Sequence, residues 1–124
     1  QMRYLMNIIL SPEYDSGAKP IPEAINDAMG PYIEKVVASG TLISTGGLKR
    51  SKDAVRISGG SGRTVATDGP FTEAKEIIGG YAVIEAADAA AAAKVGAEFV
   101  QLHIDSGMPD ITVEVREIEG GYNY

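Results

Sequence analysis

Two segments of the chain alternate as β-strands do, yet they are apolar on both faces. In the segment from Met2 to Leu10, Met6 points to one side and Leu5 to the other. The segment from Ile77 to Ala86 also has apolar residues in both of its alternating sets. Successive side chains leave a strand in opposite directions, so both faces of these strands must be covered. This requirement limits the fold to a sheet that lies between two layers.

Two helices are predicted to form one of these layers. From Pro22 to Ser39, apolar residues recur at the spacing of one helical face, and Gly30-Pro31 predicts a kink because proline removes a backbone donor. Asp88 is placed to cap an alanine-rich helix that runs to about His103. His103 suits the negative end of that helix and is expected to be exposed to solvent or to cap the helix, with catalysis as the minor alternative. The inward face of this helix would consist of Ala92, Val95, Phe99 and Leu102.

The other strands are separated by turn residues. They are predicted at Thr41–Leu48, at Ala54–Ser58 and Arg63–Thr67 as a hairpin, and at Ile111–Ile118. Asp68-Gly69-Pro70 ends the hairpin, since proline cannot donate to a continuing strand. Ser11 to Ile21 is rich in Pro, Asp, Ser and Gly and is expected to form a flexible flap.

This order of elements predicts an α+β domain with ferredoxin-like βαββαβ topology and an inserted β-hairpin. A chain of 124 residues is expected to form one core, so residues 1–124 make a single domain. Both helices would cover one face of the sheet and leave the other face bare. Because the two-faced strands need cover there, a second subunit is the simplest solution, and a homodimer is predicted.

Composition excludes several classes of function. The net charge of −6 disfavours direct nucleic-acid binding, which needs clustered positive charge. The chain has no cysteine and one histidine, so no metal site is predicted. The glycine pairs match neither GxGxxG nor a P-loop, so no nucleotide or other cofactor is predicted. Without a membrane-spanning apolar run or a signal-peptide pattern, the protein is expected in the cytoplasm, away from membranes.

The segment Asp68-Gly69-Pro70-Phe71-Thr72-Glu73-Ala74-Lys75-Glu76 resembles the signature of the DGPF branch of the YCII-related family. Further similar pieces follow the family order, namely Met2-Arg3-Tyr4-Leu5-Met6, Ser39-Gly40-Thr41-Leu42, Gly46-Gly47-Leu48, Gly79-Gly80-Tyr81 and Glu114-Val115-Arg116. The resemblance spans nearly the whole chain. It implies a dimeric α+β barrel in which two sheets face one another, with a cleft between each sheet and its helices.

The resemblance implies little about activity. Some relatives are fused to extracytoplasmic-function sigma factors or are their neighbours, which suggests a functional link to a sigma factor. In the namesake branch, a His-Asp pair has been suggested as the active site, with the histidine on the first helix. No histidine occurs between Pro22 and Ser39 here, so that suggestion does not transfer.

Asp68 is the candidate catalytic residue. Its carboxylate is either a general base or an acceptor for the backbone amides of its own turn, and the turn is the favoured interpretation. Phe71 and Glu76, from the same motif, are candidate ligand contacts. Glu73, Lys75 and Glu76 fit a solvated face with local ion pairs, or else a polar wall of the cleft.

Three more candidate ligand contacts lie outside the motif. Tyr32 is on the buried helix stripe, where core packing is favoured over a hydroxyl that donates into the cleft. Glu114 and Arg116 fall on the bare sheet face, because the intervening apolar residues claim the helix side. An inter-subunit ion pair of Arg116 with Glu114, Asp68 or Glu76 is favoured there, and binding of a carboxylate or phosphate is the alternative.

Two functions stay open at this stage. The favoured one is a homodimer that senses or binds a small molecule in its cleft, or binds a protein. The alternative is an enzyme without metal or cofactor that moves protons on an enolisable or carboxylated metabolite, with Asp68, Arg116 and Tyr32 as its candidate residues.

Overall fold

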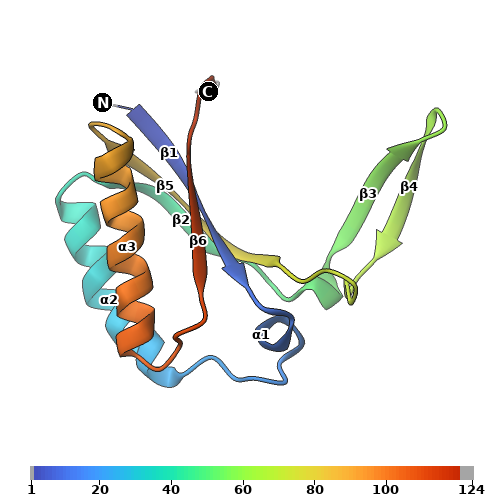
Figure 1. The fold of residues 1–124 in the computed structure, drawn as a ribbon, viewed down its shortest axis with the longest axis horizontal. Coiled ribbons are helices and arrows are strands. Elements are labelled where there is room, and N and C mark those ends of the chain that lie inside the picture. The colour runs from blue at the N-terminus through green and yellow to red at the C-terminus, as the bar shows by residue number, and fades with distance from the viewer. Residues whose placement is uncertain (1, 121–124) are drawn as a thin grey trace.

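A computed structural model describes residues 2–120 and shows a four-stranded antiparallel sheet with two long helices on one face (Figure 1). The order of its strands is β2-β5-β1-β6, and β3 and β4 pair separately. The elements are β1 (Met2–Leu10), α1 (Pro12–Ser16), α2 (Glu23–Ala38), β2 (Leu42–Gly47), η1 (Ser51–Asp53), β3 (Val55–Gly60), β4 (Arg63–Asp68), β5 (Ile77–Ala86), α3 (Ala89–Asp105) and β6 (Thr112–Glu117). The ferredoxin-like α+β fold with an inserted hairpin is thereby confirmed.

The core lies between the sheet and helices α2 and α3. The two central strands, β1 and β5, form the sheet side of this core. Along both strands, residues that face the helices alternate with half-buried residues on the other face. The buried apolar residues that meet there include Tyr4, Met6, Ile25, Ala82, Ile84, Ala92, Phe99 and Met108. Asp88 caps α3 as predicted, because its carboxylate accepts a hydrogen bond from Ala91 N at 2.8 Å.

His103 is buried, with 5% of its surface exposed, so the expectation of exposure is wrong. Helix α3 continues to Asp105, which places His103 inside the last turn. Its buried face is therefore formed by Ala92, Gly96, Phe99 and His103, with Val95 and Leu102 half-buried beside it. His103 Nδ1 lies 2.8 Å from the Phe99 carbonyl oxygen, and the two rings are 4.4 Å apart.

The predicted flap contains a short helix with buried residues. Within α1, Tyr14 and Asp15 are 4% and 9% exposed. The segment does contain a turn, since Gly17 ends α1 with a φ of +83°. Two of its polar residues nevertheless face protein, because Tyr14 bonds to Asp110 and Asp15 bonds to Ser51.

The sheet face away from the helices is open, as the sequence predicted. Register partners share a face, so Leu5 and Val83 lie together on it, and so do Ile9 and Ile78. Tyr81 lies on the same face, over Gly46 of β2. Ion pairs flank this apolar centre: Arg3 Nε is 3.5 Å from Glu85 Oε1 on register partners, and Arg116 is near Glu114 on β6.

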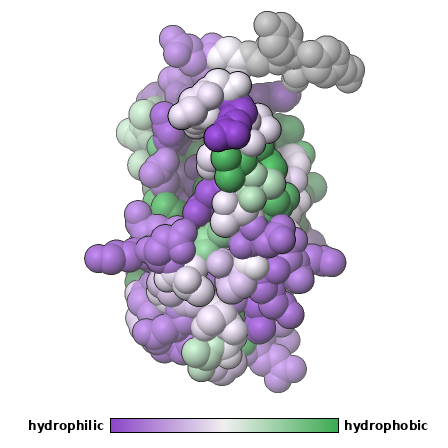
Figure 2. Space-filling view, turned by 90° about the vertical axis from the view of Figure 1, so that its right-hand side faces the viewer, coloured by the Kyte–Doolittle hydropathy of each residue, from purple (hydrophilic) through white to green (hydrophobic). Residues whose placement is uncertain are grey.

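The β3–β4 hairpin stands away from the sheet and its helices (Figure 1). Every residue of both strands is exposed, and the strands turn at Ser61 and Gly62, which both have positive φ. Val55 and Ile57 lie on one face of the hairpin together with Ala66. Figure 2, which looks from the side of the hairpin, shows apolar surface gathered in the upper half between polar margins.

Candidate functional site

The motif loop, residues 69–76 between β4 and β5, is held by a buried carboxylate from α1. Asp15 accepts a hydrogen bond from Ser51 N at 2.8 Å and another from Ser51 Oγ at 2.5 Å. Ser51 is 4% exposed and begins η1. Its Oγ also accepts a hydrogen bond from Phe71 N at 3.3 Å. Asp15 thus fixes η1, and through Ser51 it fixes the motif loop.

Gly69 allows the closest backbone contact in this region. A Cβ atom at residue 69 would lie 1.6 Å from the Ser51 carbonyl oxygen, so no side chain fits there. The Gly69 N–H donates to the Ala54 carbonyl at 2.8 Å. The glycine of the motif is therefore required by the approach of two backbone segments. The Gly69–Pro70 peptide bond is cis.

Arg56 connects the base of the hairpin to the motif loop. Its guanidinium carbon lies 4.1 Å from the centre of the Phe71 ring, and its Nη1 is 3.2 Å from Glu73 Oε1. A cation over an aromatic face is attracted by the ring quadrupole, and the adjacent carboxylate adds an ion pair. This contact turns the Arg56 face of the hairpin toward the loop.

Three adjoining cavities, the motif cavities, have volumes of about 400, 490 and 260 Å³. The first two are lined by residues of the motif loop, and the third lies beside them without touching the loop. The first lies between α1 and the loop and is lined by Asp15, Pro70 and Phe71 among others. The second shares Phe71 and Ile77 with the first and extends to the base of the hairpin. The third shares Leu48, Lys49, Arg50 and Ile78 with the second.

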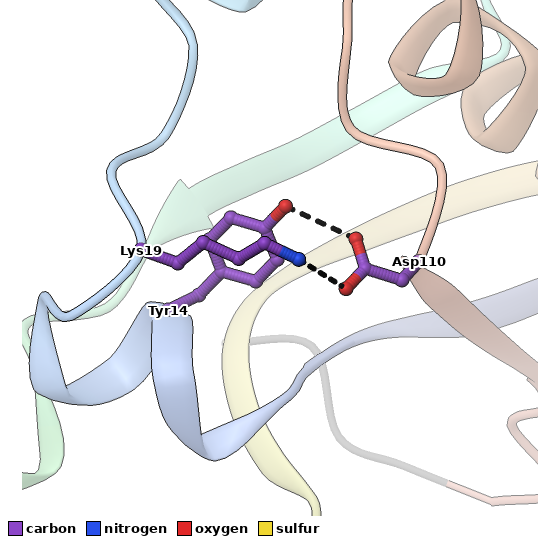
Figure 3. A network of polar contacts seen from close by, with 3 residues as sticks. All are labelled: Tyr14, Lys19 and Asp110. Carbon is purple, nitrogen blue, oxygen red and sulfur yellow. Dashed lines mark hydrogen bonds and ion pairs between the residues drawn. The ribbon is translucent and has the colours of Figure 1, made fainter.

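Tyr14 and Lys19 line the third cavity. Both also contact Asp110, and the three side chains form a polar cluster (Figure 3). Tyr14 Oη donates to Asp110 Oδ1 at 3.0 Å, and Lys19 Nζ lies 3.2 Å from Asp110 Oδ2. The hydrogen bond from Tyr14, together with Lys19, lowers the pKa of the Asp110 carboxyl. The same carboxylate raises the pKa of Lys19, and burial with the Asp110 contact raises the pKa of Tyr14.

Residues 2–100 match the family model of the YCII-related domain. The chain belongs to the YCII-related family. The match covers the motif loop, α1, η1 and the lining of all three motif cavities. No curated protein matches the chain. The narrower assignment to the DGPF branch stays a prediction from the residues of the motif.

The predicted site residues of this YCII-related domain fall in three separate places. Phe71 and Glu76 line the second motif cavity, so the motif does contribute to a hollow surface. Asp68 is exposed at the end of β4, where it is the register partner of Val55, and it lines none of the three motif cavities. Within residues 2–120, the Asp68 carboxylate accepts no hydrogen bond from the backbone amides of its turn and forms no ion pair.

Glu114 and Arg116 lie on the open face, as alternation predicted. Arg116 Nη1 is 3.9 Å from Glu114 Oε1, and the Arg116 side chain is 75% exposed. Such an exposed pair contributes little to stability by itself. Arg116 thus meets Glu114 of its own strand, and the inter-subunit ion pair stays a prediction.

Tyr32 packs in the helix layer, with its ring centre 6.5 Å from that of Phe99. Its hydroxyl is buried and has no hydrogen-bond partner within the described residues, and burial raises its pKa. The cavity that it lines between the sheet and the helices has a volume of only about 30 Å³. The cleft expected between these layers is thus nearly filled, because Met6, Phe99 and their neighbours pack into it.

Sequence reasoning missed the residues that position the site, Asp15 and Ser51, and it missed Arg50, which lines two of the cavities. Asp15 and Ser51 are 36 positions apart, so no local spacing signals their contact. Their only signals were an acidic residue in the first turn of a short helix and a serine before a strand. Within residues 2–120, no group of His, Cys, Asp and Glu side chains could hold a metal ion. In the same residues, no helix is long and apolar enough to cross a membrane.

Proposed function

We propose that this YCII-related protein is a homodimeric small-molecule-binding domain whose ligand site lies in the motif cavities. The observation that supports this best is a set of three adjoining cavities, two of them lined by a loop that buried polar contacts hold in place. Small-molecule sites are typically preformed, mostly apolar hollows of about 300 to 1,000 Å³ with a few polar groups. The two larger motif cavities fall in this range.

The homodimer is supported by the open sheet face. Leu5, Tyr81 and Val83 form an apolar centre there that the rest of the described chain leaves partly exposed. Ile78 belongs both to this face, as the register partner of Ile9, and to the lining of two motif cavities. A second subunit that covers the face would therefore also close the open side of the site.

Ligand binding is tested by filling the second cavity. Ala74 is half-buried and lines it, so Ala74→Phe should occupy the space where a ligand would sit. Ala38→Phe, at the exposed end of α2, adds the same bulk elsewhere and serves as control. In a thermal-shift screen of metabolites, ligands that stabilise the natural protein should lose their effect in Ala74→Phe alone. Equal effects in both variants would contradict this location of the site.

The dimer is tested by placing a charge on the open face. Val83→Glu should convert the dimer to monomers, because an unpaired carboxylate would be buried between two sheets. Val37→Glu makes the same change at a 55% exposed position of α2, on the other side of the molecule. Sedimentation velocity should show a dimer for the natural protein and for Val37→Glu. A monomeric natural protein would refute the proposal.

An acid–base enzyme would use the same cavities, where Glu76 is a carboxylate that lines the second one. It is distinguished from a binding domain by incubating each stabilising metabolite with the protein and analysing it by mass spectrometry. Recovery of an isomer or a breakdown product would favour the enzyme, and unchanged metabolite favours the binding domain. The functional link to a sigma factor and the cytoplasmic location stay predictions.

A further inference from the structure

We infer that the ligand of the motif cavities is a small organic anion, with a carboxylate or phosphate head held by Arg50 and an apolar body against Leu48 and Ile78. This inference rests on the proposed function and adds the chemical class of the ligand. Both aliphatic residues are about half exposed, at 51% and 50%, and both line the second and third motif cavities. Arg50 lines the same two cavities.

Charge is distributed unevenly along this acidic chain. Residues 48–78, which include the motif loop and the hairpin, carry six Lys and Arg against four Asp and Glu, a net charge of +2. The remaining residues carry five against thirteen, a net charge of −8. An anion should therefore approach this segment more favourably than the rest of the chain.

Cations at the cavities are left without internal partners. Lys49, Arg50 and Lys52 line the motif cavities, and none of them forms an ion pair within residues 2–120. Arg56 and Lys19 differ from them, because Glu73 and Asp110 already neutralise their charges. A ligand head group would supply the carboxylate or phosphate that the first three lack.

The Arg50 guanidinium also lies beside the end of α1, next to the third motif cavity. It lies directly against the backbone of Gly17, where an added Cβ would be 2.6 to 2.8 Å from three of its atoms. Gly17 has a φ of +83° and ends α1, which the Asp15 network anchors to η1 beside Arg50. A planar guanidinium at this place can bind a carboxylate or phosphate through two parallel hydrogen bonds.

The experiment compares a charged and a neutral fluorescent probe of similar shape, anilinonaphthalene sulfonate and N-phenylnaphthylamine. The natural protein should bind the sulfonate more tightly than the amine. Arg50→Met should weaken sulfonate binding at least about tenfold, because a charge-assisted hydrogen bond is lost, and should leave amine binding unchanged. Lys35→Met, on the exposed surface of α2, removes the same charge away from the site and should change neither.

Competition identifies the head group. Octanoate and octyl phosphate should each displace the sulfonate, and octanol should displace it much less. Greater potency of octanoate indicates a carboxylate ligand, and greater potency of octyl phosphate indicates a phosphate. Arg50→Lys, which keeps the charge but loses the planar fork, should fall between the natural protein and Arg50→Met. If Arg50→Met does not fold by circular dichroism, Lys49→Met takes its place.

Two other results have distinct meanings. If both probes bind, Ala74→Phe blocks them and Arg50→Met leaves the sulfonate unaffected, the site exists but the anionic ligand is refuted. If Ala74→Phe changes the binding of neither probe, the ligand does not occupy the second motif cavity, and the proposed location fails with the inference.

Discussion

Asp15 is the residue on which the arrangement of the site depends. Its buried carboxylate satisfies both the N–H and the hydroxyl of Ser51. In Asp15→Ala these two donors would remain buried without an acceptor, which costs about 2 kcal/mol in the free energy of unfolding. Asp27→Ala, at an exposed position of α2, should cost much less. Urea unfolding of the two variants tests this, and equal losses would show that the Asp15 network is not stabilising.

Asp110 gives the stability of the protein a dependence on pH. Its pKa is lowered in the folded state, so its contribution is present above the ordinary pKa of an aspartate, about 3.9, and is lost as pH falls through the folded value. Lys19 has a raised pKa, so its contribution is lost only as pH rises above about 10.4. The difference in unfolding free energy between the natural protein and Asp110→Asn should therefore be constant near neutral pH and shrink in acid. A difference that persists at pH 2 would contradict this assignment.

These residues also show where sequence reasoning ends. Alternation placed Glu114 and Arg116 on the open face correctly, because the side chain period of a strand is fixed by its backbone. His103 was misplaced because the end of α3 lies two residues further on, and near a helix end such a shift decides between protein and solvent. The Asp15–Ser51 contact could not be predicted at all, since only the assembled fold brings α1 and η1 together.

At the scale of elements, the motif loop is a junction between three segments. Arg56 joins the hairpin to the loop, η1 lies against Gly69, and α1 supplies Asp15. The sequence indicated a turn at this place but not its purpose, because a glycine for a turn and a glycine for close approach look alike. A Cβ atom added at residue 69 would overlap the Ser51 carbonyl oxygen, which shows that this glycine is needed for close approach.

Gly69→Ala tests this junction. The added methyl group would clash with a backbone oxygen that cannot move without displacing η1, so the free energy of unfolding should fall by about 3 kcal/mol or more. Gly59→Ala, in β3, meets no atom within 4 Å and should be nearly neutral. Thermal unfolding compares them. A Gly69→Ala protein as stable as Gly59→Ala would mean that the loop does not pack against η1.

At the scale of the whole molecule, the uncovered surfaces are the open sheet face and the projecting hairpin. A hairpin of two strands is at best marginally stable in water by itself. Arg56 turns one of its faces toward the motif loop, which leaves the face with Val55, Ile57 and Ala66 directed outward. Val55 and Ile57 are 55% and 61% exposed there. In the proposed dimer, this face is the natural contact for a second subunit.

Ile57→Ser tests whether the hairpin contacts the second subunit of the proposed dimer. Loss of a buried aliphatic side chain costs about 1.5 to 3 kcal/mol, so the dissociation constant of the dimer should rise at least about tenfold. Val65→Ser removes a β-branched residue from the opposite face, where Val65 is 52% exposed and pairs with Ser58. Val65→Ser should leave the dimer intact, although it lowers the strand propensity of the hairpin about as much as Ile57→Ser does. Sedimentation velocity over a range of concentrations measures both constants. If the two variants dissociate equally, the hairpin weakens the dimer only by losing its own structure, and the open sheet face alone must hold the subunits together.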